Sequence, residues 1–214
     1  MSDAENKKTL KQGLEAASAF FSPENLAKLK ITFNGDVALM VIDVQKQFCD
    51  PQTNYKRGSF ETNLIATNIQ DASTAFRKAS IPVYAVHFGT KAKTAAEVDF
   101  HHFAPTPKDT LISKITNSAF EGPNNQTNKT LSDDGRKLLL MCGFNLSACV
   151  MTTAIDAVTY GYDVCVLEDL TGNDGSNRHC NKAIDIQIMK DSGVTFASSA
   201  EALRAIMAAK APKP

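Results

Sequence analysis

Cys149 is the residue of this chain whose surroundings most clearly indicate reactivity. It lies within the stretch from Gly143 to Gly161, GFNLSACVMTTAIDAVTYG. This pattern predicts the end of a buried strand, a tight loop and a helix that begins within one turn of the cysteine. Because backbone N–H groups and the helix dipole both favour an ionised thiol there, we expect a thiolate with a pKa below that of a free cysteine.

Two further reactive side chains stand at the ends of predicted strands. Asp43 closes the apolar run at 37–43, and Lys114 closes a short run at 111–114. Taken singly, an aspartate at a strand end is more often a turn or cap residue, and a lysine is more often solvated surface. Ligands of open parallel sheets bind at the carboxyl ends of strands. Together with Cys149, the two side chains therefore predict a site with a nucleophile, a base and a cation.

The elements that must position these residues alternate along the chain. Apolar runs predict strands at 37–43, 83–88, 111–114, 137–143, 163–168 and 194–197. Apolar residues at helical spacing predict helices at about 61–79, around and after 149, at 181–191 and at 200–209. Continuous apolar runs are typical of strands that are buried on both faces. The alternation predicts an α/β fold, a three-layer α/β/α sandwich with a doubly wound, mostly parallel, Rossmann-like sheet of about six strands.

Three regions are expected along the chain. Residues 1–35 are predicted to be an N-terminal helical extension, because Leu10, Leu14, Ala17 and Phe21 recur at helical spacing. Whether this extension packs on its own domain or on a second subunit stays open. Residues 36–209 form the main domain, and residues 210–214 are predicted to be a frayed tail.

Composition limits the function classes that remain. The chain has 214 residues, with 23 basic and 23 acidic side chains and a net charge of zero, so no basic excess indicates nucleic acid as a partner. No stretch reaches the roughly 18 apolar residues of a membrane helix, and the first residues lack the apolar core of a signal peptide. The odd number of cysteines, five, argues against a disulfide framework. We expect a cytoplasmic protein that acts on a small molecule, with neither nucleic acid nor membrane as a partner.

Three motifs resemble those of the isochorismatase-like hydrolases, also called the cysteine hydrolase superfamily. They occur in the order of that family, and the resemblance covers about residues 36–205. The motifs are ValIleAspValGlnLysGlnPhe at 41–48, LysIleThrAsnSerAlaPhe at 114–120 and GFNLSACVMTTAIDAVTYGYDV at 143–164. The third is highly specific for the family.

The resemblance implies a catalytic triad of Cys149, Asp43 and Lys114. Cys149 would attack the carbon of a small amide, ureido or carbamoyl compound and form a thioester-type intermediate, without a cofactor. Asp43 would accept the thiol proton, and Lys114 would keep that carboxylate ionised. The resemblance also implies a cis peptide bond between Phe144 and Asn145. That bond would place the backbone N–H of Asn145 beside the N–H of Cys149 as an oxyanion hole. Relatives commonly form dimers or tetramers, so a homo-oligomer is expected.

Three more side chains are candidates for the substrate pocket. Phe48 and Phe120 could form an apolar wall for a planar substrate, or could pack in the core. His87 could line the pocket or be a hydrogen-bonded histidine at the edge of the core. The polar segment at 121–129, which could still form a helix from Thr127 onward, leaves specificity open.

No metal site is expected. Metal-dependent relatives carry an Asp-x-His pair shortly after the first motif, whereas this chain has Asp50, Pro51 and Gln52 there. His101 and His102 are interpreted as an exposed loop pair. These features favour a metal-free relative.

Two other classes of function stay open. One is a thiol redox or electrophile-binding protein that uses the same thiolate without turnover. The other is a catalytically silent scaffolding relative, for which the N-terminal extension is the main support.

Overall fold

The computed structural model describes residues 20–22, 24–25, 31, 35–53, 56–89, 99–122, 126–177 and 180–210. Most of the predicted extension at 1–35, part of the loop after residue 89 and residues 211–214 therefore lie outside the described residues.

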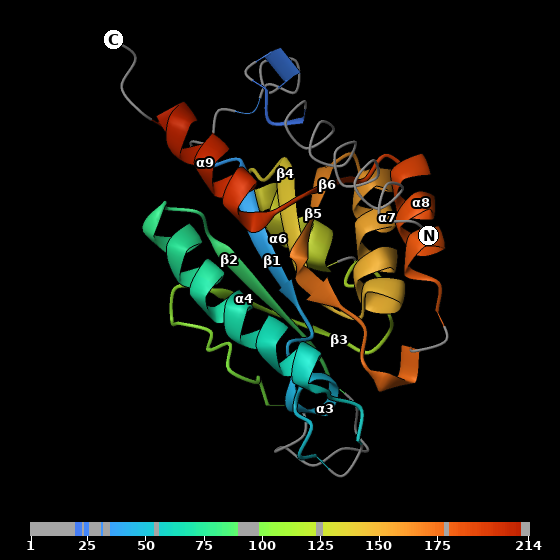
Figure 1. Cartoon of the computed structure of the whole chain (residues 1–214). Coiled ribbons are helices and arrows are strands. Elements are labelled where there is room, and N and C mark those ends of the chain that lie inside the picture. Colours follow the sequence, from blue (N-terminus) through green and yellow to red (C-terminus); the bar gives the residue numbers. More distant parts are fainter. Residues whose placement is uncertain are drawn as a thin grey trace, which may run out of the picture.

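Six parallel strands form a single sheet (Figure 1). Its order is β3-β2-β1-β4-β5-β6, so the chain winds outward from β1 in one direction and from β4 in the other. The strands are β1 Val37–Ile42, β2 Val83–Phe88, β3 Thr110–Lys114, β4 Leu138–Phe144, β5 Asp163–Gly172 and β6 Thr195–Ala197. The doubly wound α/β fold that the sequence predicts is thus confirmed.

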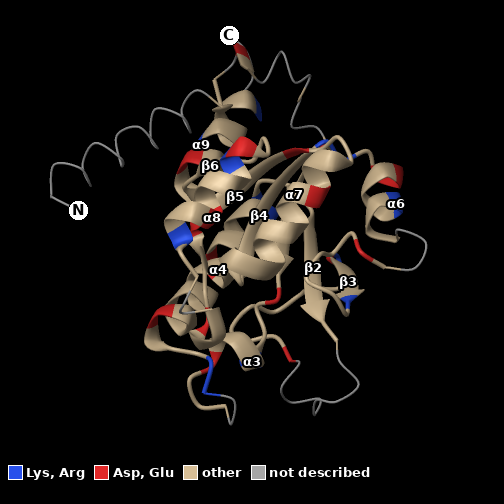
Figure 2. Ribbon diagram, turned by 90° about the vertical axis from the view of Figure 1, so that its right-hand side faces the viewer, with Lys and Arg blue, Asp and Glu red and all other residues tan. Residues whose placement is uncertain are grey.

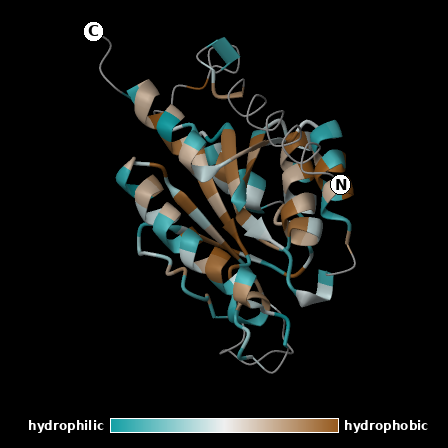
Figure 3. Cartoon of the chain, in the orientation of Figure 1, coloured by the Kyte–Doolittle hydropathy of each residue, from teal (hydrophilic) through white to brown (hydrophobic). Residues whose placement is uncertain are grey.

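Helices cover both faces of this sheet. Alternate residues of β1 separate the two cores: Val37, Leu39 and Val41 face one side, and Ala38, Met40 and Ile42 face the other. The first core is shared with α4 (Phe60–Lys78) and α9 (Ser199–Lys210). The second is shared with α6 (Gln126–Asp133), α7 (Met151–Thr159) and α8 (Lys182–Asp191). Figure 3 shows mostly apolar strands between these layers, and Figure 2 shows the charged residues mainly on helices and loops.

Helix α4 has the clearest local signals. Ser59 is its N-cap, where its side chain accepts from the N–H of Thr62 while the Thr62 hydroxyl accepts from the N–H of Ser59. This reciprocal pair satisfies two backbone donors that the first helical turn leaves free.

Among the described residues, no helix is both long and apolar enough to cross a membrane.

Several element ends differ from the sequence-based prediction. Strand β5 continues to Gly172, because burial resumes at Leu170 after the exposed Glu168 and Asp169 interrupt the apolar run. A short helix, α3 (Lys46–Cys49), follows β1 and was not predicted. Helix α9 includes Lys210, whose Nζ donates to the Ala79 carbonyl at 2.6 Å, so this residue does not belong to a frayed tail.

Gly143 allows the two central strands to approach each other where they end. It pairs with Ile42 and has a φ of +118°, a conformation that residues with a Cβ rarely adopt. A Cβ at this position would lie 1.9 Å from the Ile42 carbonyl oxygen. Since Asp43 follows Ile42, this close approach brings the ends of β1 and β4 together.

Gly143→Ala is therefore expected to lower the free energy of unfolding by about 4 kcal/mol or more, through backbone strain and a clash with β1. The matched control is Gly161→Ala, because Gly161 has a φ of +89° but no atom within 4 Å of an added Cβ. The control should cost only about 1–2 kcal/mol. Urea unfolding of both variants measures the difference, and equal costs would show that strand proximity at Gly143 is unimportant.

Candidate active site

Three strands bring the predicted reactive side chains to one edge of the sheet. Asp43 follows β1, Lys114 is the last residue of β3, and Cys149 lies in the turn after β4. Lys114 Nζ is 2.7 Å from Asp43 Oδ2, and both side chains are within hydrogen-bond reach of the Cys149 thiol. Asp43 is 1% exposed, Lys114 3% and Cys149 5%. The structure thus brings the three residues together in a buried cluster.

The backbone around Asp43 is held by the neighbouring strand. Asp43 has a φ of +52°, its N–H donates to the Val86 carbonyl at 2.9 Å, and its own carbonyl accepts from the N–H of Gln45. The Gln45 side chain accepts from the N–H of Phe88 at 2.7 Å and donates to the Phe88 carbonyl at 3.2 Å. A left-handed aspartate held in this way is typical of a functional position. The role of Gln45 was missed, although it lies within the first motif.

Lys114 is fixed by three kinds of contact. Besides Asp43, its ammonium donates to the Thr116 carbonyl at 3.1 Å and lies 4.7 Å from the centre of the Phe88 ring. The ring face attracts a cation, and the carbonyl satisfies another of its N–H donors. The ammonium is therefore held against the carboxylate rather than extended into water.

Cys149 lies in a π-helical turn, Leu146–Val150, that precedes α7. The Phe144–Asn145 peptide bond is cis, as the resemblance implies. The Asn145 carbonyl accepts from the N–H groups of Ala148 and Val150 at 3.1 and 3.0 Å. These bonds close the turn around the cysteine. The oxyanion hole formed by the N–H groups of Asn145 and Cys149 stays a prediction.

The unpredicted end of β5 holds the same turn from the other side. Asn173 Oδ1 accepts from the N–H of Ser147 at 2.9 Å, and Asn173 Nδ2 donates to Ser147 Oγ at 2.8 Å. The N–H of Asp174 donates to Asn145 Oδ1 at 2.6 Å. Asn173 and Asp174 are therefore residues of the site that the sequence reasoning missed. The sequence signal that could have identified them is a pair of polar residues directly after a buried strand.

The protonation state of Cys149 differs from the expectation. Burial, with the charge of Asp43, raises the pKa of the thiol to about 12, although the Lys114 ammonium acts in the opposite direction. The prediction of a depressed pKa was wrong, because desolvation of the sulfur outweighs the helix terminus and the cation. At neutral pH the sulfur therefore carries its proton, next to a carboxylate that can accept it.

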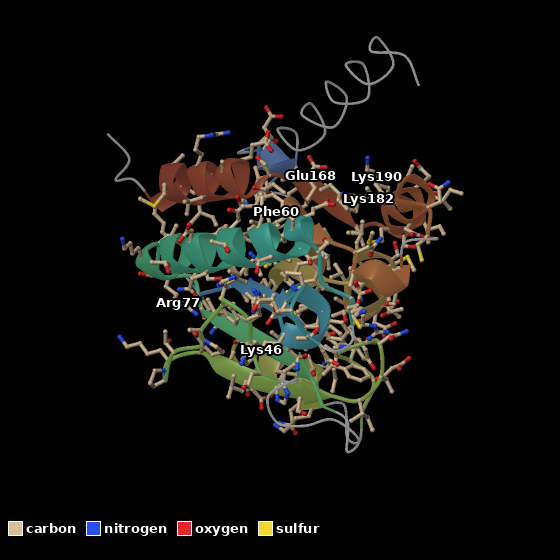
Figure 4. All side chains as sticks on the ribbon, turned by 60° about the horizontal axis from the view of Figure 1, so that its bottom comes forward. Lys46, Phe60, Arg77, Glu168, Lys182 and Lys190 are labelled. Carbon is tan, nitrogen blue, oxygen red and sulfur yellow. The ribbon has the colours of Figure 1, made fainter. Side chains whose placement is uncertain are left out.

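The three pocket candidates lie in different places. Phe48, in α3, is buried, and the guanidinium of Arg57 lies 5.8 Å from the centre of its ring. Figure 4 shows the molecule with the end that carries α3 turned toward the viewer. Lys46, the first residue of α3, is labelled there. His87 packs edge to face on Phe100, and burial together with the charge of Lys114 lowers its pKa.

Phe120 is buried and packs against two aromatic rings. Its ring stacks on Tyr160 with 5.3 Å between ring centres, and it also contacts the ring of Tyr162. Tyr160 follows the last residue of α7, whereas Cys149 precedes the first. Phe120 therefore packs in the core, which is one of the two roles that the sequence left open, and its part in a substrate pocket stays a prediction.

His101 and His102 lie in a loop, where His102 is exposed, and both contact α4. Their Nε2 atoms both contact Asn63 Oδ1, at 2.7 and 3.0 Å, which ties this loop to α4. Burial and the neighbouring His102 lower the pKa of His101. Across the described ranges, no group of three or more histidine, cysteine or acidic side chains is arranged to hold a metal ion.

The larger of the two described hollows, of about 1130 Å³, is remote from the triad. Pro82, Val83 and Arg136 line it at the amino ends of β2 and β4, the opposite end of the strands from Cys149. Its size is therefore no guide to the substrate of the triad.

Comparison with known proteins identifies the family. The family profile described as "Isochorismatase domain" matches residues 37–201, and the chain therefore belongs to the isochorismatase family. It is 31% identical over 141 residues to an uncharacterized isochorismatase family protein, YddQ, of Bacillus subtilis, which covers 62% of this chain and 75% of that protein.

Two solved structures show the same fold. One is a cysteine hydrolase from Pseudomonas syringae pv. phaseolicola, with a TM-score of 0.71 and 22% identity over 81% of this chain and 93% of that one. The other is a pyrazinamidase of Pyrococcus horikoshii in complex with zinc, with a TM-score of 0.65 and 21% identity over 76% of this chain and 99% of that one.

Lys114→Met should lower the free energy of unfolding by about 3–5 kcal/mol, because it removes the ammonium partner of a buried carboxylate. The double variant Asp43→Asn/Lys114→Met should recover part of this loss, since the charge that was left behind is gone. Urea unfolding of the single and double variants measures the coupling.

The control for this cycle is Lys129→Met, which breaks the exposed pair with Asp133 at 2.5 Å and should change stability by no more than about 0.5 kcal/mol. If Lys114→Met cost no more than this control, the buried pair would contribute nothing to the fold.

Proposed function

We propose that this chain is a cysteine hydrolase that cleaves the C–N bond of a small amide, ureido or carbamoyl compound. The observation that carries the proposal is the buried contact among Cys149, Asp43 and Lys114, in which a thiol meets a carboxylate held by an ammonium. The missing histidine after Asp50 further suggests a reaction that needs no metal.

Each group has a defined task in the proposed reaction. Cys149 Sγ forms a bond to the carbonyl carbon as its proton passes to Asp43, and the carbonyl electron pair moves to the oxygen. The N–H groups of Asn145 and Cys149 would receive that oxyanion. When the pair returns, the C–N bond breaks, and Asp43 gives its proton to the leaving nitrogen.

Hydrolysis of the thioester completes the cycle. Asp43 takes a proton from water, whose oxygen forms a bond to the acyl carbon. The C–S bond then breaks, and the proton returns to the sulfur of Cys149. Lys114 keeps Asp43 ionised between these transfers, so the carboxylate can serve as a base in both steps.

The raised pKa of Cys149 supports this order of events over the redox alternative. Peroxide oxidises the thiolate rather than the thiol, so a sensor needs a sulfur that is ionised at rest. A neutral sulfur beside a carboxylate instead suits a proton transfer that accompanies attack on the substrate.

The relatives support the same class of reaction. The fold is similar to that of a protein named as a cysteine hydrolase and to that of a pyrazinamidase, whose name indicates an amide substrate. The homo-oligomer and the cytoplasmic location stay predictions.

A panel of small primary amides, ureido and carbamoyl compounds tests the function through release of ammonia or amine. We expect turnover of at least one compound, and a loss of roughly 10³-fold or more in Cys149→Ala, because that variant lacks the nucleophile. Cys180→Ala is the control, since Cys180 is exposed and lies outside the cluster. Full turnover by Cys149→Ala would exclude the mechanism. No turnover of any compound would favour the scaffolding alternative.

Asp43→Asn should move the pKa of Cys149 and the turnover rate in the same direction, both downward. Removing the carboxylate charge lowers the pKa of the thiol, so alkylation by iodoacetamide begins at lower pH than in the unmodified chain. Turnover falls about 10²- to 10⁴-fold, because the base is lost. Peptide mass spectrometry across a pH series, with Cys180 as the internal reference, measures the alkylation. Turnover that rose together with thiol ionisation would contradict the role of Asp43 as base.

A further inference from the structure

Asn117 is a third polar neighbour of the sulfur. Its Oδ1 lies 3.8 Å from Cys149 Sγ, within the range of a weak sulfur hydrogen bond. Asn117 itself is exposed, whereas Cys149 is 5% exposed. The carboxamide of Asn117 therefore lies at the boundary between the sulfur and the solvent, where a substrate must arrive.

The segment that carries Asn117 is held on both sides. Before it, the Thr116 carbonyl accepts from Lys114 Nζ, and the Thr116 hydroxyl donates to the Ser118 carbonyl at 3.1 Å. After it, the N–H of Ala119 donates to the Thr153 hydroxyl of α7 at 3.1 Å. The backbone on either side of Asn117 is thus tied both to Lys114 and to the helix that follows Cys149.

Charge and hydrogen bonding at the sulfur select a type of ligand. The two charged groups that act on Cys149 are Asp43 and Lys114, and they have opposite signs. Asn117 adds no charge but offers one acceptor and two N–H donors. An amide or ureido group has the complementary acceptor and donors, whereas an ester lacks the N–H and a carboxylate adds a negative charge beside Asp43.

We propose that Asn117 is a specificity-determining residue that accepts an N–H of the substrate's scissile carboxamide or ureido group. This inference rests on the proposed hydrolysis and narrows its substrates to unsubstituted or singly substituted amides and ureas, in preference to esters and free acids. The Oδ1 atom that now contacts the sulfur would accept from the leaving nitrogen, which keeps its N–H close to Asp43.

Alkylation of Cys149 tests the inference without a known substrate. Iodoacetamide, methyl iodoacetate and iodoacetate differ only in the group next to the carbon that sulfur attacks: an amide, a neutral ester and a carboxylate. In each case the S–C bond forms and iodide leaves. The rate at Cys149 for each probe, divided by the rate of the same probe with free 2-mercaptoethanol, gives a preference that is free of the probe's intrinsic reactivity.

We expect Cys149 to prefer the amide probe over the ester, and Asn117→Ala and Asn117→Leu to reduce this preference about five- to tenfold, as for the loss of one hydrogen bond. Asn117→Asp keeps an acceptor but adds a charge. It should therefore retain the amide preference over the ester and react more slowly with iodoacetate than the unmodified chain does.

The chain offers a matched control. Asn177 Oδ1 lies 3.8 Å from Cys180 Sγ, which is the same contact on a thiol outside the cluster. Asn177→Ala should leave the absolute rates at Cys149 unchanged for all three probes.

Two failures can be told apart. If Asn117→Ala and Asn117→Leu keep the full amide preference while Asp43→Asn still shifts the pH dependence of alkylation, the inference about Asn117 is overturned and the proposed function stands. If neither Asp43→Asn nor Lys114→Met alters alkylation of Cys149, the triad itself has no chemical effect, and both proposals fall.

Discussion

The buried ion pair between Asp43 and Lys114 is the interaction on which the site depends. The two residues stand at the ends of β1 and β3, with β2 between them, so the lysine side chain reaches past Phe88 to the carboxylate. Burying two charges costs more than their attraction returns unless the geometry and the remaining hydrogen bonds are favourable. The Thr116 carbonyl supplies one such hydrogen bond to the ammonium, and the contacts of Gln45 with Phe88 tie the segment after Asp43 to the end of β2.

Cys149, the proposed nucleophile, is held by a separate set of contacts. These contacts place it beside the ion pair at the carboxyl edge of the sheet. Gly143 allows β4 to end against β1, and the extension of β5 supplies Asn173 and Asp174 to the turn that carries Cys149. Asp43, the proposed base, and Cys149, the proposed nucleophile, thus come from opposite winding directions of the sheet. Their site therefore forms where the strand order reverses. A change in the packing of β1 against β4 would move one group relative to the other.

The sequence predicted those features that depend on local pattern. Apolar runs identified the strands, and motif spacing identified Cys149, Asp43 and Lys114 before their contact was known. It failed where long-range contacts decide the outcome. The last residues of β5 pair with Gly143 and Phe144 after a register shift that no local pattern reveals. For Phe120 the sequence left a pocket wall and core packing open, and only the structure shows its ring stacked on Tyr160.

The pKa of Cys149 is the most instructive of these differences, because it changes what the surroundings must do. A helix terminus and a nearby ammonium favour a thiolate, but they act on a sulfur that burial has removed from water. Since the sulfur is neutral at rest, the cluster cannot attract a substrate by the charge of a thiolate, and Asp43 and Lys114 largely offset each other. Neutral hydrogen bonding at the point of entry, as we propose for Asn117, would then distinguish one substrate from another. Asn117 Oδ1 contacts the sulfur, and under the proposal above it would supply that hydrogen bond to the substrate.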